Sequence, residues 1–158
     1  MDRPAELSEA MIEKMRAIGL RLDRAGTFWH EGTSITHPRL RQALLRWLDV
    51  RDDGKNIVKL DDKRYAYVDV DDAHLRAKSA RWDGDRCTML WDDDQEEELD
   101  YASLCQAHDH ALYVNVRKRL RGRIGGPAYH QVAEHIVEIE GGFALEAARK
   151  RWPIANAA

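Results

Sequence analysis

Hydrophobic positions along the chain recur with helical spacing in some segments and alternate with polar residues in others. Residues 5–18 carry one apolar stripe, which predicts an amphipathic helix ending at Gly19; its members are Leu7, Met11, Met15 and Ile18. A second stripe follows Pro38, a residue suited to the first turn of a helix; its members are Leu40, Ala43, Leu44, Trp47 and Leu48. We therefore predict a second helix that stops near the turn at 52–54.

Short runs of β-type residues separated by turn residues predict strands and hairpins elsewhere. The expected strands cover 20–22, 27–30, 56–60, 65–70, 75–82, 86–91 and 112–116. A short helix is expected over 101–108. A longer helix is expected after Gly125-Gly126-Pro127, and its apolar positions are Tyr129, Val132, Ala133, Ile136 and Val137.

The two helices that begin with proline share one template at a fixed offset along the chain. Pro38 superposes on Pro127, Leu40 on Tyr129, Leu44 on Ala133, Trp47 on Ile136 and Leu48 on Val137. A glycine-containing turn and an alternating β segment follow each helix, so we infer an internal duplication.

The predicted fold class is α+β, with two related half-domains that each combine an antiparallel sheet and a covering helix. The expected boundaries are an N-terminal helix at 1–19, half-domains at 20–74 and 75–146, and a C-terminal tail at 147–158. The shared apolar stripes suggest that the halves pack together, and such a junction is a natural ligand cleft.

Composition excludes several classes of protein. The 158 residues are 44% hydrophobic and 34% charged with a net charge of −3, which is typical of a globular protein whose overall field attracts neither polyanions nor membranes. No window reaches the ~18 apolar residues of a membrane span. Two cysteines and the absence of a signal-peptide pattern at the start predict a cytoplasmic location.

A basic run at 117–123 holds five cations in seven residues. On a straight strand one face would carry Arg117, Arg119, Arg121 and Arg123, and guanidinium groups suit phosphate geometry. Glycines at 122, 125 and 126 would allow close backbone approach, and the start of the following helix would favour an anion. The alternative is a solvated edge strand protected by its charge.

Two further interpretations of charged residues are weaker. Nucleic-acid binding would use stacking by Trp29, Tyr113 and Tyr129, but the pI of about 6.2 and the acidic run at 92–100 disfavour it. That run of seven acids lacks a calcium-loop pattern and is expected to be a solvated loop. Metal-ligand spacing is also absent among His108, His110, His130, Glu134 and His135, so we predict no metal site and assign no cofactor.

Several short motifs, in order, resemble one bacterial family. They are residues 24–40, Asp53-Gly54, 70–73, 113–117, Leu120, Arg121, Arg123, 128–130 and 141–145. In this order and spacing, the chain over about 20–146 resembles the bacterial domain-of-unknown-function family numbered 1285. The resemblance implies two related α+β halves, the C-terminal one superficially like a pleckstrin-homology fold. It also implies a nucleotide-like ligand at their interface and a part in bacterial signalling.

Three functional hypotheses remain open. The first is a non-enzymatic ligand-binding or regulatory protein whose site residues are Trp29, Arg117, Arg119, Arg121, Arg123, Tyr129 and His130. Here the arginines hold an anionic or nucleotide-like small molecule, and Trp29 or Tyr129 stacks on it. The second is a hydrolase-type enzyme with acid–base candidates Asp109, His110 and His130. The third is a protein-interaction module that presents the acidic and basic runs to partners.

Overall fold

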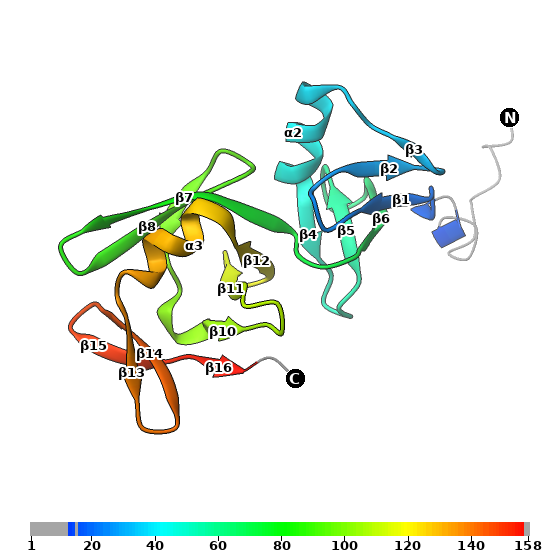
Figure 1. Cartoon of the computed structure of the whole chain (residues 1–158). Helices are drawn as coiled ribbons and strands as arrows, with labels where there is room; N and C mark the ends of the chain where they lie inside the picture. The colour runs from blue at the N-terminus through cyan, green and yellow to red at the C-terminus, as the bar shows by residue number, and fades with distance from the viewer. Residues whose placement is uncertain (1–12, 15, 157–158) are drawn as a thin grey trace, which may run out of the picture. The chain divides into compact units, whose positions relative to one another are not determined.

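The computed structural model describes residues 13, 14 and 16–156, and the chain divides into two compact units, Met1–Asp72 and Ala73–Ala158 (Figure 1). Both units consist mostly of strands, and the described part of each holds one α-helix, so the α+β class is confirmed. Most of the helix expected over 5–18 lies outside the described residues. Of the described residues there, Glu13, Lys14 and Arg16 have helical backbone.

The first unit contains a six-stranded sheet in the order β3-β2-β1-β6-β5-β4. Its strands are β1 Leu20–Leu22, β2 Phe28–His30, β3 Thr33–Ser34, β4 Leu48–Val50, β5 Asn56–Lys59 and β6 Tyr65–Val70. The predicted hairpins β1–β2 and β5–β6 are confirmed. The prediction of a purely antiparallel sheet is wrong, because β1 and β6 pair in parallel with Leu20 opposite Val68.

Helix α2, Pro38–Trp47, packs against β5 and covers part of this sheet (Figure 1). Its first turn is capped by His37, whose Nδ1 accepts the Leu40 N–H at 3.3 Å. Leu45 is fully buried in the core, whereas Leu48, predicted to be helical, already belongs to β4. The core beneath the helix is completed by Leu20, Leu22, Phe28, Leu44, Val58 and Val68.

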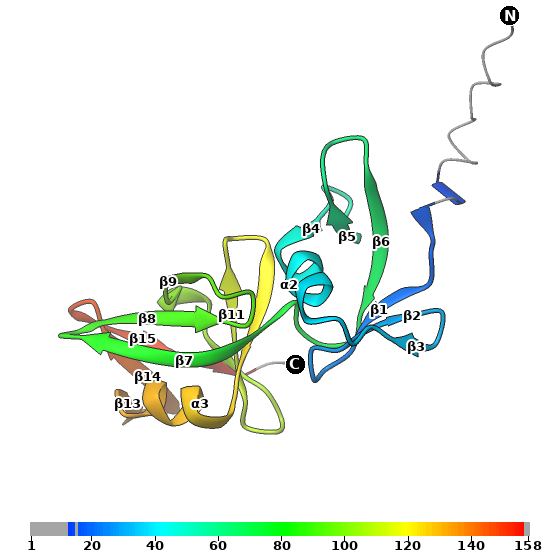
Figure 2. The same cartoon turned by 90° about the horizontal axis from the view of Figure 1, so that it is seen from above.

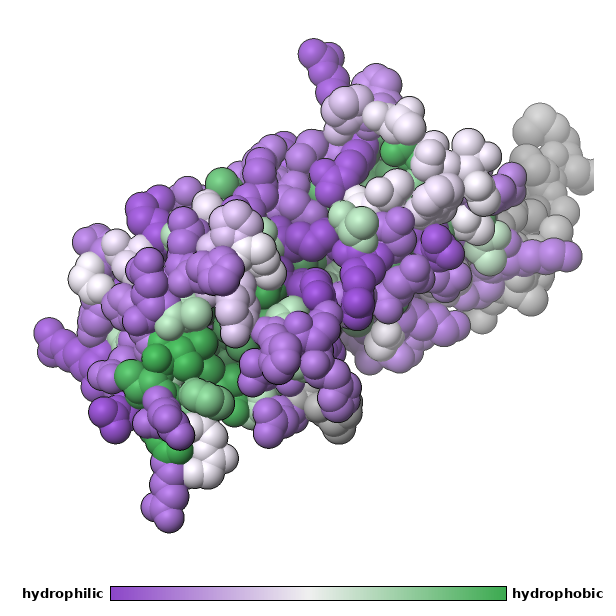
Figure 3. Space-filling model, in the orientation of Figure 1, coloured by the Kyte–Doolittle hydropathy of each residue, from purple (hydrophilic) through white to green (hydrophobic). Residues whose placement is uncertain are grey.

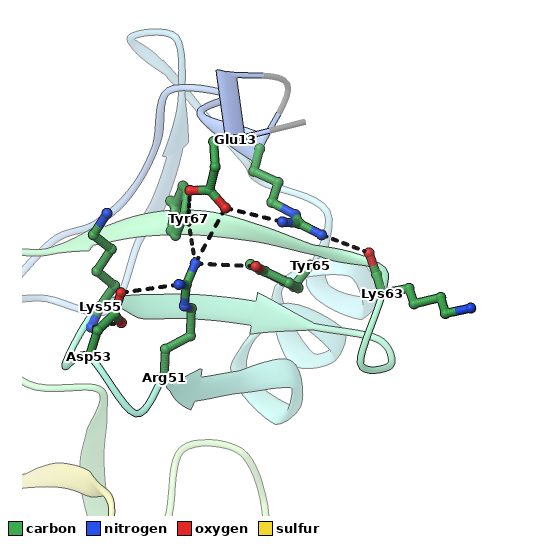
Figure 4. A network of polar contacts seen from close by, with 8 residues as sticks. Glu13, Arg51, Asp53, Lys55, Lys63, Tyr65 and Tyr67 are labelled. Atoms are coloured by element: carbon green, nitrogen blue, oxygen red, sulfur yellow. Dashed lines mark hydrogen bonds and ion pairs between the residues drawn. The ribbon is translucent and has the colours of Figure 1, made fainter. Parts of the chain in front are cut away.

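A polar network attaches the start of the described chain to β6 (Figure 4). The Tyr67 hydroxyl donates to Glu13, and Arg51 donates to the hydroxyls of Tyr67 and Tyr65. Arg16 pairs with Glu13 at 3.1 Å and lies over the Tyr65 ring at 3.8 Å. The hydrogen bond from Tyr67, supported by Arg16 and Arg51, holds the pKa of Glu13 below its ordinary value, and the same bond raises the pKa of Tyr67 to about 12.

The second unit contains a seven-stranded sheet in the order β16-β10-β11-β12-β7-β8-β9. Its strands are β7 Leu75–Asp83, β8 Arg86–Trp91, β9 Glu96–Glu98, β10 Cys105–Gln106, β11 Leu112–Val116, β12 Leu120–Ile124 and β16 Ala155–Asn156. The long β7–β8 hairpin, seen in Figure 2, is confirmed. This sheet is mixed as well, because β7 pairs with β12 in parallel and places Leu75 opposite Gly122.

A smaller sheet of β13 Ile136–Ile139, β14 Gly142–Ala147 and β15 Lys150–Pro153 follows helix α3, Gly126–Ala133. The prediction that this helix extends to Val137 is wrong: Ile136 and Val137 lie in β13, where β-branched residues pair with β14. The helix packs on β7 through Trp82, whose indole donates to the Gln131 carbonyl at 2.7 Å and stacks on His135. The residues expected as a tail at 147–158 include β15 and β16.

The acidic run is part of the folded structure. Asp92 and Asp93 are 8% and 0% exposed, and residues 96–98 form β9, so the predicted solvated loop is wrong. Arg76 lies 2.7 Å from Asp92, which explains how this carboxylate is accommodated away from water. A 3-10 turn at Tyr101–Ser103 and β10 replace the short helix expected at 101–108. No helix in the described part of the chain has the length and apolar character of a bilayer span.

Candidate functional site

The basic run does not form one straight strand. Arg117 and Lys118 have φ values of 48° and 68°, and together with Arg119 they form the turn between β11 and β12. The strand begins only at Leu120, so the prediction that four arginines share one strand face is wrong. A turn that reverses the chain removes Arg117 and Arg119 from the face that carries Arg121 and Arg123.

Arg117 is partly exposed and pairs with a buried carboxylate of the second unit. Its Nη1 and Nη2 atoms lie 2.9 and 2.6 Å from Oδ2 of the fully buried Asp93, and its backbone N–H donates to Glu97. Burial raises the pKa of the Glu97 carboxyl, although the charge of Arg117 acts in the opposite direction. Arg117 therefore stabilises the fold around the acidic run.

Arg121 and Arg123 flank one aromatic ring on the β11–β12 hairpin. Strand register places Tyr113 opposite Arg123. The guanidinium carbon of Arg121 lies 4.1 Å from the centre of the Tyr113 ring, and that of Arg123 lies 5.5 Å away. Arg123 also donates to the Tyr113 hydroxyl and to Asp109, both at 2.6 Å. Burial lowers the pKa of Arg123, but the hydrogen bonds and charges of Asp109 and Tyr113 together outweigh it, and the net shift of the pKa is upward.

A pocket of 240 Å³ lies beside Arg123. It is lined by Asp109, His110, Ala111, Arg123, Gly125, Gly126, Tyr129 and His130. Three residues of the predicted ligand site therefore meet here: Arg123, Tyr129 and His130. The three acid–base candidates, Asp109, His110 and His130, line the same pocket.

The first turn of α3 forms one wall of this pocket. Gly125 is the N-cap residue in an extended conformation, Gly126 has a φ of 55°, and Pro127 follows. No side chain caps this end, and the first turn contains no acid. The N–H groups and the helix dipole at this position favour an anion. Glycine is needed at 126, because other residues adopt this backbone conformation only with strain.

Two imidazoles complete the wall. Within the described residues, neither the His110 nor the His130 imidazole forms a hydrogen bond or ion pair with a neighbour, although His130 meets the Tyr129 ring edge-on at 5.7 Å. Asp109 accepts from Ala111 N–H and pairs with Arg123. The acid–base hypothesis requires titratable side chains that converge in one pocket, and Asp109, His110 and His130 do share this one. This geometry leaves both imidazoles accessible to a bound molecule.

Tyr129 also borders a second, apolar pocket. This 210 Å³ pocket lies among α3, β13, β14 and the β10–β11 strands, and it is lined by Gln106, Leu112, Tyr129, Ala133, Ile136, Glu138, Phe143 and Ile154. Figure 3 shows hydrophobic side chains gathered on this part of the second unit. No local sequence pattern brings these residues together as a group, because they come from strands and a helix that are far apart in the chain.

Gly122 has a different role from the one predicted. A Cβ atom at this position would lie 2.4 Å from the Trp91 ring and 2.7 Å from Val116. The glycine is therefore required by the packing of Trp91 in the core and does not expose backbone to a ligand.

Trp29 lies in the first unit and is held in place there. Its indole N–H donates to Asp23 at 2.9 Å, and Arg21 lies over its ring at 5.7 Å. Burial raises the pKa of Asp23, but hydrogen bonds from Trp29 and Thr27 outweigh it and hold the pKa below its ordinary value. Phe28 is the fully buried member of this strand.

The histidines and acids were also considered as metal ligands. Within residues 13–14 and 16–156, no three side chains of His, Cys, Asp or Glu converge in a way that could hold an ion. The described cysteines are free; Cys87 is buried and Cys105 is half-buried.

Comparison with known proteins identifies the fold. The chain is similar to the crystal structure of a DUF1285 family protein from Silicibacter pomeroyi DSS-3, with a TM-score of 0.73 and 20% identity over 88% of this chain and 80% of that one. It is also similar to a DUF1285 family protein from Shewanella baltica OS155, with a TM-score of 0.62 and 16% identity over 75% of this chain and 93% of that one. No family model matches the chain, and no curated protein matches it significantly. The resemblance drawn from the motifs is thus confirmed at the level of the fold.

Proposed function

We propose that the second unit binds a small anionic molecule in the pocket between Arg123 and the first turn of α3. The observation that carries the proposal is the convergence of hydrogen-bond-donating groups there: Arg123, the two imidazoles and an uncapped helix start without acids. Asp109, the carboxylate among the lining residues, is paired with Arg123 at 2.6 Å. Arg123 is held in place by Asp109 and Tyr113, so little side-chain freedom would be lost on binding.

Tyr129 supports a ligand with an apolar or aromatic part. The ring lines both the polar pocket and the apolar one, so a molecule that joins an anionic group to a flat ring could occupy both. A nucleoside monophosphate has this composition. Trp29, Arg117, Arg119 and Arg121 line neither pocket, and a ligand site at the interface of the halves stays a prediction.

We include in this proposal the internal duplication of the two units and a role of the protein in signalling. In both units a helix beginning near a proline passes directly into a hairpin, α2 into β4–β5 and α3 into β13–β14. This shared order supports two related halves. A non-enzymatic ligand-binding unit with a duplicated plan fits a regulatory protein that responds to a small anion.

Isothermal titration with adenosine monophosphate, inorganic phosphate and adenosine tests the proposal. We expect saturable binding of the monophosphate, weaker binding of phosphate, and at least ten-fold weaker binding of adenosine. Arg123→Gln should weaken the monophosphate at least ten-fold, and His130→Ala several-fold. Arg81→Gln, which changes an exposed arginine on β7 by the same charge, should have no effect.

Two results would overturn the proposal. One is the absence of saturable binding by both anionic compounds. The other is wild-type affinity in the His130→Ala and Arg123→Gln variants. Because the His130 side chain is exposed, His130→Ala should fold normally and keeps the test decisive if Arg123→Gln is unstable.

A further inference from the structure

The first unit has an open apolar groove beside α2 that takes no part in the proposed anion site. The groove encloses 460 Å³, and nine of its twelve lining residues are apolar. Its floor is formed by buried side chains of the sheet and helix, including Leu20, Val58 and Leu44. It is therefore a depression in the surface of the unit's own core.

Exposed apolar side chains concentrate along this groove. The large hydrophobic residues exposed in the described chain are Ile18, Leu40, Trp47, Leu60 and Phe143, and all except Phe143 line the groove. Their exposed fractions run from 36% for Trp47 to 52% for Leu60. Single exposed hydrophobic residues are ordinary, whereas a cluster around one depression indicates a binding surface.

The shape of the groove suits a helix. Leu40, Leu44 and Trp47 occupy positions i, i+4 and i+7 of α2 and form one wall about two turns long. A partner helix lying alongside would present its own apolar residues at the same spacing.

The charged residues around the groove favour a partner with acidic side chains. Helix α2 carries Arg39, Arg41 and Arg46 and no acid. Arg64 also lines the groove, but its guanidinium is already paired with Asp61 at 2.7 Å. Arg41 donates to the Gly26 carbonyl, and Arg39 is exposed on the first turn. Among the described residues, no carboxylate lines the groove. This wall is complementary to acidic side chains that flank an apolar stripe.

We propose that this groove binds an acidic amphipathic α-helix of a partner protein. Leu40, Trp47 and Leu60 would receive its apolar stripe, and Arg39 would face its carboxylates. The contact covers little more than two helical turns, so we expect micromolar affinity and strong dependence on salt.

Fluorescence anisotropy with the full chain tests the proposal. The probe is a labelled 18-residue peptide with leucines at helical i, i+3 and i+7 spacing and glutamates on the opposite face. One control peptide has the same composition in scrambled order, and another has lysine in place of every glutamate. We expect the acidic helix to bind saturably and at least ten-fold tighter than either control.

Variants locate the binding to the groove. Leu40→Glu and Leu60→Glu should each weaken the peptide at least ten-fold, and Arg39→Glu several-fold. Phe143→Glu is the matched control, because Phe143 is as exposed as Leu60 but lies in the second unit, and it should bind as the wild type does. Unchanged thermal melting would show that the variants are folded.

The proposal is overturned by equal binding of the scrambled peptide, by no peptide binding, or by unchanged affinity in both Leu40→Glu and Leu60→Glu. Stronger binding of the chain to phosphatidylglycerol vesicles, lost in the same two variants, would assign the groove to an anionic membrane surface and overturn the helix as its occupant. None of these outcomes depends on the anion site, which is tested with different variants and ligands.

Discussion

Arg117 reaches back from the β11–β12 turn to Asp93, and its Nη2 atom lies 2.6 Å from a carboxylate that has no exposed surface. The pair connects the turn of one hairpin to the end of another, twenty-four residues away in the chain. A buried charge is tolerated only while it is paired, and the Arg117 side chain is 34% exposed, so Asp93 depends on Arg117 more than Arg117 depends on Asp93.

Removing either partner should therefore destabilise the second unit. We expect Arg117→Ala to lower the free energy of unfolding by about 3 kcal/mol, because it leaves the Asp93 charge buried and unpaired. Asp93→Ala should cost less, since the partly exposed Arg117 side chain can turn to water, and the double variant should be clearly less destabilised than the two effects combined. Urea unfolding measured by circular dichroism checks this. Arg39→Ala, at an exposed arginine of α2, should stay near the wild type, and strict additivity of the two changes would contradict a direct pair.

Gly122→Ala should destabilise the protein by about 2 kcal/mol, because the added methyl group would overlap the Trp91 ring and force the core apart. Gly142→Ala is a suitable control, since nothing lies within 4 Å of the position its Cβ would take. Thermal unfolding and the tryptophan emission of both variants measure the difference. Equal stability of the two would show that Trp91 moves aside freely.

The two cysteines should react at very different rates. Burial raises the pKa of the Cys87 thiol to about 11 and keeps it from solvent, whereas Cys105 is half-buried. We expect a maleimide at pH 7.5 to modify Cys105 alone in the native protein and both thiols in urea. Peptide mapping by mass spectrometry identifies the labelled residue, and rapid native labelling of Cys87 would contradict the packing described.

The network around Glu13 predicts sensitivity to acid. Because the folded pKa of Glu13 is below its ordinary value of 4.5, its contribution to stability is present above that value and is lost as the pH falls through the folded pKa. The melting temperature of Glu13→Gln should therefore fall less steeply than that of the wild type below about pH 4.5. Tyr67→Phe should behave similarly.

Melting followed by circular dichroism from pH 6 to pH 3 provides the measurement. Glu140→Gln, which removes an exposed carboxylate elsewhere, serves as the control and should follow the wild-type curve. Parallel curves for Glu13→Gln and the wild type would show that the Glu13 contacts contribute nothing to stability.

Local patterns predicted the hairpins well. The β7–β8 hairpin depends on residues adjacent in sequence, with Asp83 paired to Arg86 across the turn at Gly84 and Asp85. The end of α3 could not be placed in the same way, because Ile136 and Val137 satisfy a helical stripe and an alternating strand equally. Pairing with Leu145 and Ala144 across β13–β14 selects the strand.

The sequence predicts only part of the candidate site, again because some of its contacts join residues that are far apart in the chain. Alternation along β12 correctly separates Arg121 and Arg123 from Gly122, but it gives no sign that Arg117 and Lys118 adopt left-handed backbone conformations. The burial of Asp93 depends on Arg117, a contact between distant residues that composition cannot show. The approach of His110 to the start of α3 depends likewise on how the loop before β11 folds.

The parallel pairings of β1 with β6 and of β7 with β12 affect the order and the rate at which the strands of each unit pair during folding. β1 pairs with β2 and β7 with β8 in local hairpins, but the parallel pairings of Leu20 with Val68 and of Leu75 with Gly122 each close a loop of about fifty residues. Such non-local closure slows folding, into the millisecond-to-second range typical of β-rich proteins. During synthesis the first unit has its closing strand as soon as Val70 leaves the ribosome, and it can fold before β12 of the second unit has been made.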